Sequence, residues 1–136
     1  GAASLTIEYD ERGNPVKYSF FGLYNEPTNS LIYKYFQKII HYDKNNNVIS
    51  HSHYDPKGLP VLRTKGKSHY HSWKRIYNER GDLIEQHYYD VDNKTYAIGD
   101  DGASFLKKNY SLEGGLITTH YFDAQGKEIG IKKLKK

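Results

Sequence analysis

The sequence has 136 residues but no cysteine and no methionine, and its single tryptophan is Trp73. The lack of cysteine excludes a disulfide framework, a thiol nucleophile and every zinc site built on cysteine ligands. No apolar run approaches the length of a membrane-spanning helix, and no signal peptide is visible. We expect residues 1–4, GAAS, to be a cloning remnant. In that case, the lack of a signal peptide says nothing about the cellular location of the parent protein.

An excess of one charge is also lacking. The net charge is +4, but the terminal IKKLKK holds four lysines, and without them 16 basic residues balance 16 acidic ones. Nucleic-acid binding requires a basic face rather than a basic end, so we expect no nucleic-acid partner. We interpret residues 135–136 as the end of a solvated basic tail, and its lysines as the only part of the chain suited to contact a membrane.

Apolar residues are scarce for a thick two-layer core, at 37% with a mean hydropathy of -0.85. Aromatic residues nevertheless make up 15% of the chain, including 14 tyrosines, which is not the composition of a disordered segment. Tyrosine buries a large ring and leaves its hydroxyl at a wet edge. The composition therefore predicts a thin sheet that is buried mainly by rings.

One pattern recurs along the chain. Its copies read YDERGNPVKYSFFG, YDKNNNVISHSHYD, YNERGDLIEQHYYD and YSLEGGLITTHYFD, and they begin at Tyr9, Tyr42, Tyr77 and Tyr110, in steps of 33, 35 and 33 residues. Self-similarity at such a step is typical of tandem-repeat architectures.

Each copy carries the residues of a tight turn followed by a strand. Four residues after the leading tyrosine, every copy has a residue that tolerates positive φ: Gly13, Asn46, Gly81 and Gly114. β-Branched and aromatic residues with polar ones between them follow, which indicates a half-buried strand. Three copies then have a second turn, with Gly58, Asn93 and Gly126 at equivalent positions.

We therefore predict an all-β fold, an antiparallel tandem β-hairpin array of about four copies of roughly 33 residues, as a single twisted sheet or β-roll. It would occupy one repeat domain, residues 5–134. The predicted strands are 5–10, 15–23, 31–43, 48–55, 69–77, 83–90, 103–110, 116–123 and an edge strand 129–134. A helix is the alternative for 31–43, although its Tyr, Ile and Phe content favours a strand.

The motifs resemble a family of bacterial YDxxGN tandem hairpin repeats. YDERGNP at 9–15 and YNERGDLIEQHYYD at 77–90 match best, and GKSHYHSWKRIYNERG at 66–81 carries the intervening strand. The chain is also loosely similar to YD repeats and to MORN-like hairpins. The resemblance implies a hairpin array without catalytic residues, carried by large, exported or envelope-associated bacterial proteins. Asn46 in place of Gly, and the missing Asp after Tyr110, depart from the pattern.

The histidines are the sharpest candidates for chemistry. His51 and His53 lie two residues apart, as do His69 and His71, so each pair projects from one face of a strand. Four converging imidazoles could bind zinc, copper or nickel if the two strands were neighbours. No histidine column is common to all copies and no carboxylate is placed to orient these rings, so we expect polar-face residues, no metal and no cofactor.

Two further columns suggest structural contacts. We expect the four leading tyrosines to stack as a ladder down the array, each covering its neighbour. His87 and His120 share a column and are expected to be cross-strand neighbours on a wet face.

Catalysis is not expected. The serines lie in strand-like surroundings, and there is no Gly-x-Ser-x-Gly elbow. Acidic pairs such as Asp100 and Asp101 fall in turns, where capping backbone amides is their ordinary role. No nucleophile, base and orienting group can be named together, so the sequence predicts a protein that is not an enzyme.

Rings outside the repeated columns are better candidates for ligand contact. Tyr35, Tyr70 and Trp73 belong to this group, and Tyr88 is added because strand alternation turns it away from Tyr89. Tyr70 and Trp73 differ by three positions in one predicted strand, so we expect them on opposite faces, with at most one of them exposed.

Two classes of function remain open. The first is a non-enzymatic interaction or spacer module of a larger, exported bacterial protein, with a protein as its partner. The second is binding of a glycan or cell-wall polymer through exposed aromatic side chains.

Overall fold

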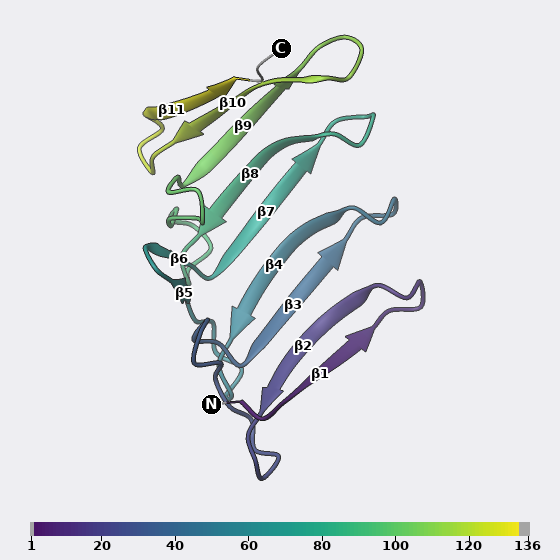
Figure 1. Ribbon diagram of the computed structural model, residues 1–136, viewed down its shortest axis with the longest axis vertical. Coiled ribbons are helices and arrows are strands. Elements are labelled where there is room, and N and C mark those ends of the chain that lie inside the picture. Colours follow the sequence, from purple (N-terminus) through teal and green to yellow (C-terminus); the bar gives the residue numbers. More distant parts are fainter. Residues whose placement is uncertain (1, 134–136) are drawn as a thin grey trace.

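The computed structural model describes residues 2–133; residues 1 and 134–136, which include parts of the predicted remnant and tail, lie outside this range. The described chain is all-β and antiparallel, as predicted. Nine strands form one open sheet in the order β1-β2-β3-β4-β7-β8-β9-β10-β11, and β5 and β6 form a separate two-stranded sheet (Figure 1). No helix in residues 2–133 is long and apolar enough to cross a membrane.

The strands follow one another through the sheet in chain order, apart from the β5–β6 excursion. They are β1 (Ser4–Tyr9), β2 (Pro15–Phe21), β3 (Gln37–Tyr42), β4 (Val48–Tyr54), β5 (Arg63–Lys65), β6 (Ser68–Tyr70), β7 (Ser72–Tyr77), β8 (Leu83–Tyr89), β9 (Phe105–Tyr110), β10 (Leu116–Phe122) and β11 (Glu128–Lys133).

A turn of one kind closes the hairpins. In the first hairpin, Gly13 N–H donates to the Asp10 carbonyl at 3.0 Å, and Asp10 N–H donates to the Asn14 carbonyl at 2.9 Å. The Asp10 carboxylate accepts the Asn14 N–H at 2.9 Å. Gly13 has a φ of 85°, which an L side chain adopts only at a cost. The other predicted positions also have positive φ: Asn46 (65°), Gly58 (82°), Gly81 (89°), Asn93 (58°), Gly114 (93°) and Gly126 (84°).

Neighbouring hairpins are joined more sparsely than the two strands within a hairpin. β3 pairs with β4 through six registered residue pairs, but β2 pairs with β3 through three. Tyrosine hydroxyl groups add a bond at the turn end of each junction, from Tyr42 to the Pro15 carbonyl (2.8 Å), from Tyr77 to Val48 (2.6 Å) and from Tyr110 to Leu83 (2.6 Å). The leading tyrosines therefore connect the hairpins through hydroxyl groups, and the expected stacking of their rings is wrong.

The two edges of the sheet differ. β11 pairs with Thr118, Thr119 and His120 of β10, the positions that correspond to those of β2 paired with β3. It thus occupies the place that a following hairpin would take. At the other edge β1 is uncovered, and Tyr9, whose equivalents are half-buried, is 61% exposed.

Several predicted strand boundaries are wrong. Residues 31–35 form a turn rather than the start of a strand, and β3 begins only at Gln37. Lys34 has a φ of 67°, which ends any extended run there. The predicted strand 69–77 is broken at His71 into β6 and β7, and the connector 62–68 contributes β5.

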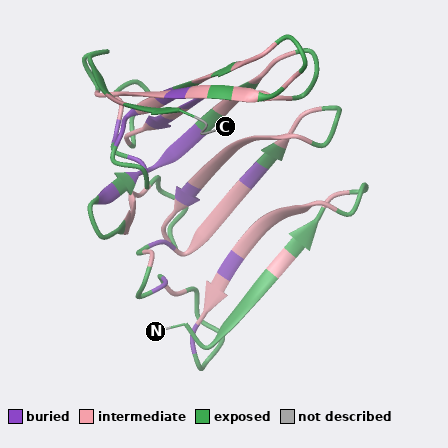
Figure 2. Ribbon diagram, turned by 45° about the horizontal axis from the view of Figure 1, so that its top comes forward, coloured by how far each residue is buried: buried purple, intermediate pink, exposed green. Residues whose placement is uncertain are grey.

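The core is thin and lies at the middle of the sheet. Tyr70, Trp73, Tyr88 and Ala97 form its buried cluster. Figure 2 shows buried segments on the central strands and an exposed β1, as expected for an array in which each hairpin is covered by its neighbours. Burial by tyrosine and tryptophan agrees with the predicted thin sheet.

The tyrosine bonds lead to a stability prediction. We expect Tyr42→Phe, Tyr77→Phe and Tyr110→Phe each to lower the free energy of unfolding by about 1 kcal/mol. Each substitution removes the hydrogen bond from the tyrosine hydroxyl to a backbone carbonyl group, which then lacks this donor. Tyr9→Phe is the matched control and should be neutral, since Tyr9 is 61% exposed and its hydroxyl bonds to no residue in 2–133. Urea unfolding measures the difference, and equal losses at all four positions would contradict it.

Candidate functional site

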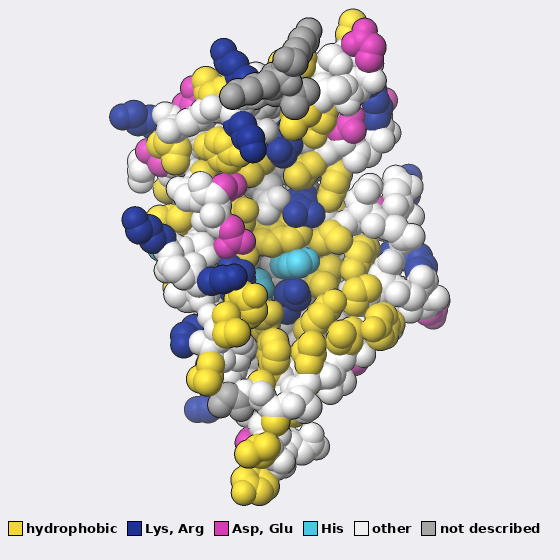
Figure 3. Space-filling view, in the orientation of Figure 1, with side chains coloured by type: hydrophobic (Ala, Val, Ile, Leu, Met, Phe, Trp, Pro, Cys, Tyr) yellow, Lys and Arg dark blue, Asp and Glu magenta, His cyan; other side chains and the backbone are white. Residues whose placement is uncertain are grey.

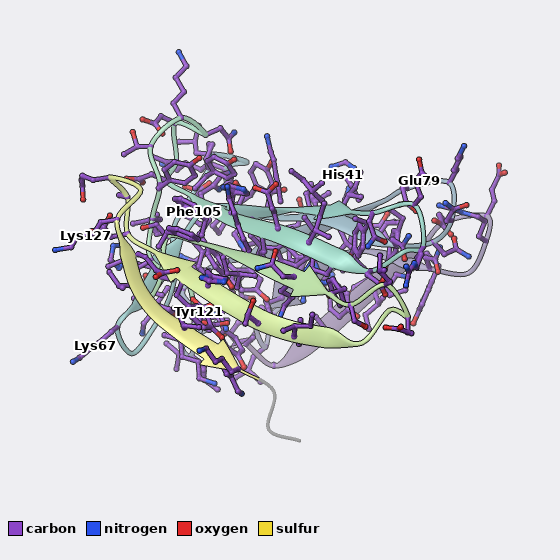
Figure 4. All side chains as sticks on the ribbon, turned by 90° about the horizontal axis from the view of Figure 1, so that it is seen from above. His41, Lys67, Glu79, Phe105, Tyr121 and Lys127 are labelled. Carbon is purple, nitrogen blue, oxygen red and sulfur yellow. The ribbon has the colours of Figure 1, made fainter. Side chains whose placement is uncertain are left out.

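Alternation divides the side chains of the sheet between two faces. Lys38, His51, Trp73, Gln86 and Leu106 lie on one face, through the cross-strand pairs that link them. We call it the cavity face. Lys74, His87 and Phe105 lie on the other, the opposite face. In Figure 4 the labelled Tyr121 belongs to the cavity face, and the labelled His41 and Phe105 belong to the opposite face.

A ladder of rings runs across the hairpins on the cavity face. Its ring pairs are Phe20–Tyr35 (5.6 Å between centroids), Tyr35–His53 (4.6 Å), His53–Tyr70 (5.8 Å) and Tyr70–Tyr88 (5.0 Å). The ladder alternates between residues near the end of a hairpin and residues seven positions before a leading tyrosine, Tyr35 and Tyr70. That position is Ala103 in the last hairpin, so the ladder ends at Tyr88.

The ladder flanks a cavity of about 520 Å³. All four residues predicted for ligand binding line it: Tyr35, Tyr70, Trp73 and Tyr88. They are buried, each at most 6% exposed, so the expectation that these four rings are exposed aromatic side chains is wrong. Figure 3 shows the corresponding region, with histidine atoms among hydrophobic side chains and both basic and acidic groups beside them.

Tyr70 and Trp73 belong to one cluster instead of lying on opposite faces. The prediction assumed a continuous strand, in which a separation of three residues reverses the side-chain direction. The break at His71 removes that relation, because Tyr70 ends β6, in the small sheet, and Trp73 lies in β7, in the large one. His71 N–H donates to the Tyr89 carbonyl at 2.8 Å, which holds the break against β8.

His51 and His53 are the polar groups of the cavity floor. His53 is 1% exposed, and its Nδ1 lies 2.8 Å from the His71 carbonyl, so Nδ1 carries the proton and Nε2 keeps a lone pair. His51 stacks on Trp73 at 4.2 Å between centroids. Burial lowers the pKa of each histidine to about 3, and neighbouring Lys38 adds to the effect, so both rings are neutral near pH 7.

The four histidines considered as metal ligands do not come together. His69 is exposed, and His71 directs its Nδ1 to the Val61 carbonyl at 3.2 Å. In residues 2–133 there is no group of three His, Asp or Glu side chains that could hold a metal ion.

Cations surround the cavity, and the sequence pattern did not predict this. Lys38, Arg63 and Arg75 line it together with Asp100 and Asp101. Lys38 comes from β3, Arg63 from β5 and Arg75 from β7, so they gather only through the topology. Alternation could have placed Lys38 and Arg75 on one face, but nothing in the repeat pattern predicted that β5 would bring Arg63 to it.

A glycine lets the acidic turn approach the ladder. A Cβ at Gly99 would lie 2.2 Å from Tyr88 ring atoms, so only glycine allows this turn to pack on Tyr88. The turn carries Asp100, which is 3.0 Å from Arg63, and Asp101, whose carboxylate accepts the Ala103 N–H at 3.1 Å. Burial raises the pKa of Asp101.

The opposite face carries a second group of rings. His87 stacks on Phe105 at 5.0 Å, and Phe105 stacks on Phe122 at 4.7 Å. His87 and His120 are not cross-strand neighbours, because β9 lies between them: His87 pairs with Phe105, and His120 pairs with Lys107. The prediction of direct neighbours is therefore wrong.

The neutral histidines lead to a pH prediction. In the unfolded chain they titrate near 6.5, but in the fold only near about 3. Protons therefore bind the unfolded state first, so stability should be complete above about pH 6.5 and should decline as the pH falls. We expect a loss of about 1 kcal/mol per histidine for each pH unit below 6, since a tenfold rise in proton concentration favours the protonated unfolded chain by at most about 1.4 kcal/mol per histidine.

Urea unfolding between about pH 7 and pH 5 measures this slope above the titration range of the carboxyl groups. His51→Gln should make the slope shallower, whereas His69→Gln, at an exposed position, is the control and should leave the slope unchanged. Equal slopes in the parent chain and His51→Gln would contradict the prediction.

Comparison with known proteins identifies no family for this chain. No protein-family model matches it, and no curated protein does. The resemblance to YDxxGN hairpin repeats therefore stays a prediction from the sequence motifs. The function has to be argued from the cavity.

Proposed function

We propose that the chain is a non-enzymatic binding module whose ligand occupies the cavity, and that the ligand is a saccharide. The observation that carries the proposal is the convergence of Tyr35, Tyr70, Trp73 and Tyr88 around one cavity that also exposes polar groups. Its volume of about 520 Å³ lies within the range of roughly 300–1,000 Å³ that ligand sites span.

The polar groups support a ligand with several hydroxyl groups. His53 Nε2 makes no hydrogen bond to any residue in 2–133, and neither nitrogen of His51 does. Arg75 Nε donates to Gln86 Oε1 at 2.9 Å, and Gln86 Nε2 donates to the Tyr88 hydroxyl at 3.1 Å, so these groups are held in place. Fixed donors and acceptors beside aromatic rings suit a sugar ring, whose faces are apolar and whose rim carries hydroxyls.

A spacer or interaction repeat of a larger, exported protein is the second candidate. It is supported by the recurrence of one junction, a tyrosine hydroxyl bonded to the preceding hairpin, at Tyr42, Tyr77 and Tyr110. The uncovered β1 edge also supports it, because an array can be extended there by a further hairpin.

Trp73 provides the test. It is the single tryptophan, and its ring contacts two cavity residues, with the His51 ring and the Arg75 guanidinium each 4.2 Å from its centroid. We expect a saturable change in its fluorescence when a panel of neutral and acidic oligosaccharides is titrated. Amide chemical shifts should move at Lys38, Trp73 and Leu106 but not at Lys74 and Tyr89. Indifference to the whole panel would leave the spacer as the remaining candidate.

A further inference from the structure

Three cations, Lys38, Arg63 and Arg75, line the same cavity. Lys38, Arg63 and Arg75 all lower the pKa of His51, after burial as the first cause, so their charges act on the same ring. Burial and Arg63 likewise lower the pKa of Lys38. Like charges gathered in a partly buried place repel one another, and the fold bears this cost without a ligand.

The partners of the three cations inside the protein are unequal. Arg63 forms an ion pair with Asp100 at 3.0 Å and stacks over Tyr70. Among residues 2–133, Arg75 bonds only to the neutral Gln86, and it lies over the Trp73 ring. Within residues 2–133, no carboxylate lies within 4.0 Å of the Lys38 ammonium or the Arg75 guanidinium. Lys38 and Arg75 are both half-buried, and both are left without a counter-charge, although the Lys38 ammonium lies over the Tyr18 ring at 4.4 Å.

Asp101, the other acidic residue that lines the cavity, is not a counter-charge for Lys38 or Arg75. Within residues 2–133, Asp101 forms no ion pair with Lys38 or with Arg75. Asp101 also binds the backbone of its own turn. The acidic turn thus balances Arg63 and leaves the side of the cavity formed by β3 and β7 positive.

We infer that the ligand of this cavity carries an acidic group, which Lys38 and Arg75 bind while its ring lies against the aromatic wall. The inference rests on the proposed saccharide function and narrows it to acidic sugars, whose carboxylate or phosphate is the shared chemistry. A charge-assisted bond to an ammonium or guanidinium group is stronger than a neutral one. The neutral His51 and His53 remain free to bind the hydroxyl groups of the ring.

The test compares glucuronic acid, glucose 6-phosphate and glucose as probes, with Trp73 fluorescence as the readout. The acidic sugars should bind more tightly than glucose because their acidic group adds a charge-assisted contact. We expect a difference on the order of tenfold in affinity, which corresponds to about 1.4 kcal/mol. Comparison of the carboxylate with the phosphate shows which acidic group the site prefers. Binding of the acidic sugars should also weaken as salt is added.

Variants assign the effect to Lys38. Lys38→Gln should weaken binding of the preferred acidic sugar by on the order of tenfold and leave glucose binding unchanged, and Lys38→Arg should restore affinity. Lys74→Gln is the matched control, since Lys74 precedes Arg75 on β7 but lies on the opposite face. Melting temperatures identify any variant that fails to fold, and Arg75→Gln provides a second removal of charge.

The outcomes separate this inference from the proposed function. Equal affinity for glucose and the acidic sugars, unchanged in Lys38→Gln, would overturn the inference and leave saccharide binding intact. Binding of neutral oligosaccharides alone would do the same. A Trp73 signal that no saccharide changes would overturn both.

Discussion

The fold depends on the contact between one hairpin and the next. Backbone pairing covers only three residue pairs between β2 and β3, half of the six within the hairpin of β3 and β4. One further backbone bond, from Phe20 N–H to the Phe36 carbonyl at 3.0 Å, extends the junction, and side chains add to it. A tyrosine hydroxyl closes its turn end, as at Tyr42, and the ring ladder closes its other end. A single hairpin is marginal in water, and the sheet becomes stable because these junctions recur.

The ladder also explains why the site is polar. An all-apolar wall would bury more apolar surface. This wall uses tyrosine and histidine, whose polar atoms need either a hydrogen-bond partner in the protein or contact with solvent. His53 satisfies Nδ1 with the His71 carbonyl and has Nε2 left over. The same packing keeps the ring neutral, because charging it would place a cation beside Lys38 in a poorly solvated place. The polar groups of the cavity are thus a consequence of how the hairpins pack.

Local chemistry made the turns and the fold class predictable from the sequence. Gly13 and Asn46 belong to the residue types that tolerate positive φ, so their turns could be predicted. The period of the repeat indicated where each hairpin begins. Contacts between distant segments were not predictable in this way. The break at His71 depends on a bond to Tyr89, and it carries Tyr70 into the cluster of Trp73. Arg63 reaches the cavity only because β5 leaves the main sheet.

The differing edges follow from the same junction. The second turn after β10 leads directly into β11. The second turns after β4 and β8, and the turn at Gly22 to Glu26 that follows β2, lead into longer loops, each with a single bridge back to the strand, such as that of Tyr54 with Pro60. The shorter connection lets β11 lie along Thr118 to His120 and satisfy the backbone that another hairpin would have covered. Its lysines also disfavour pairing with a further strand. Within residues 2–133 no such strand covers β1, so the two edges of the sheet differ in the backbone they leave unpaired.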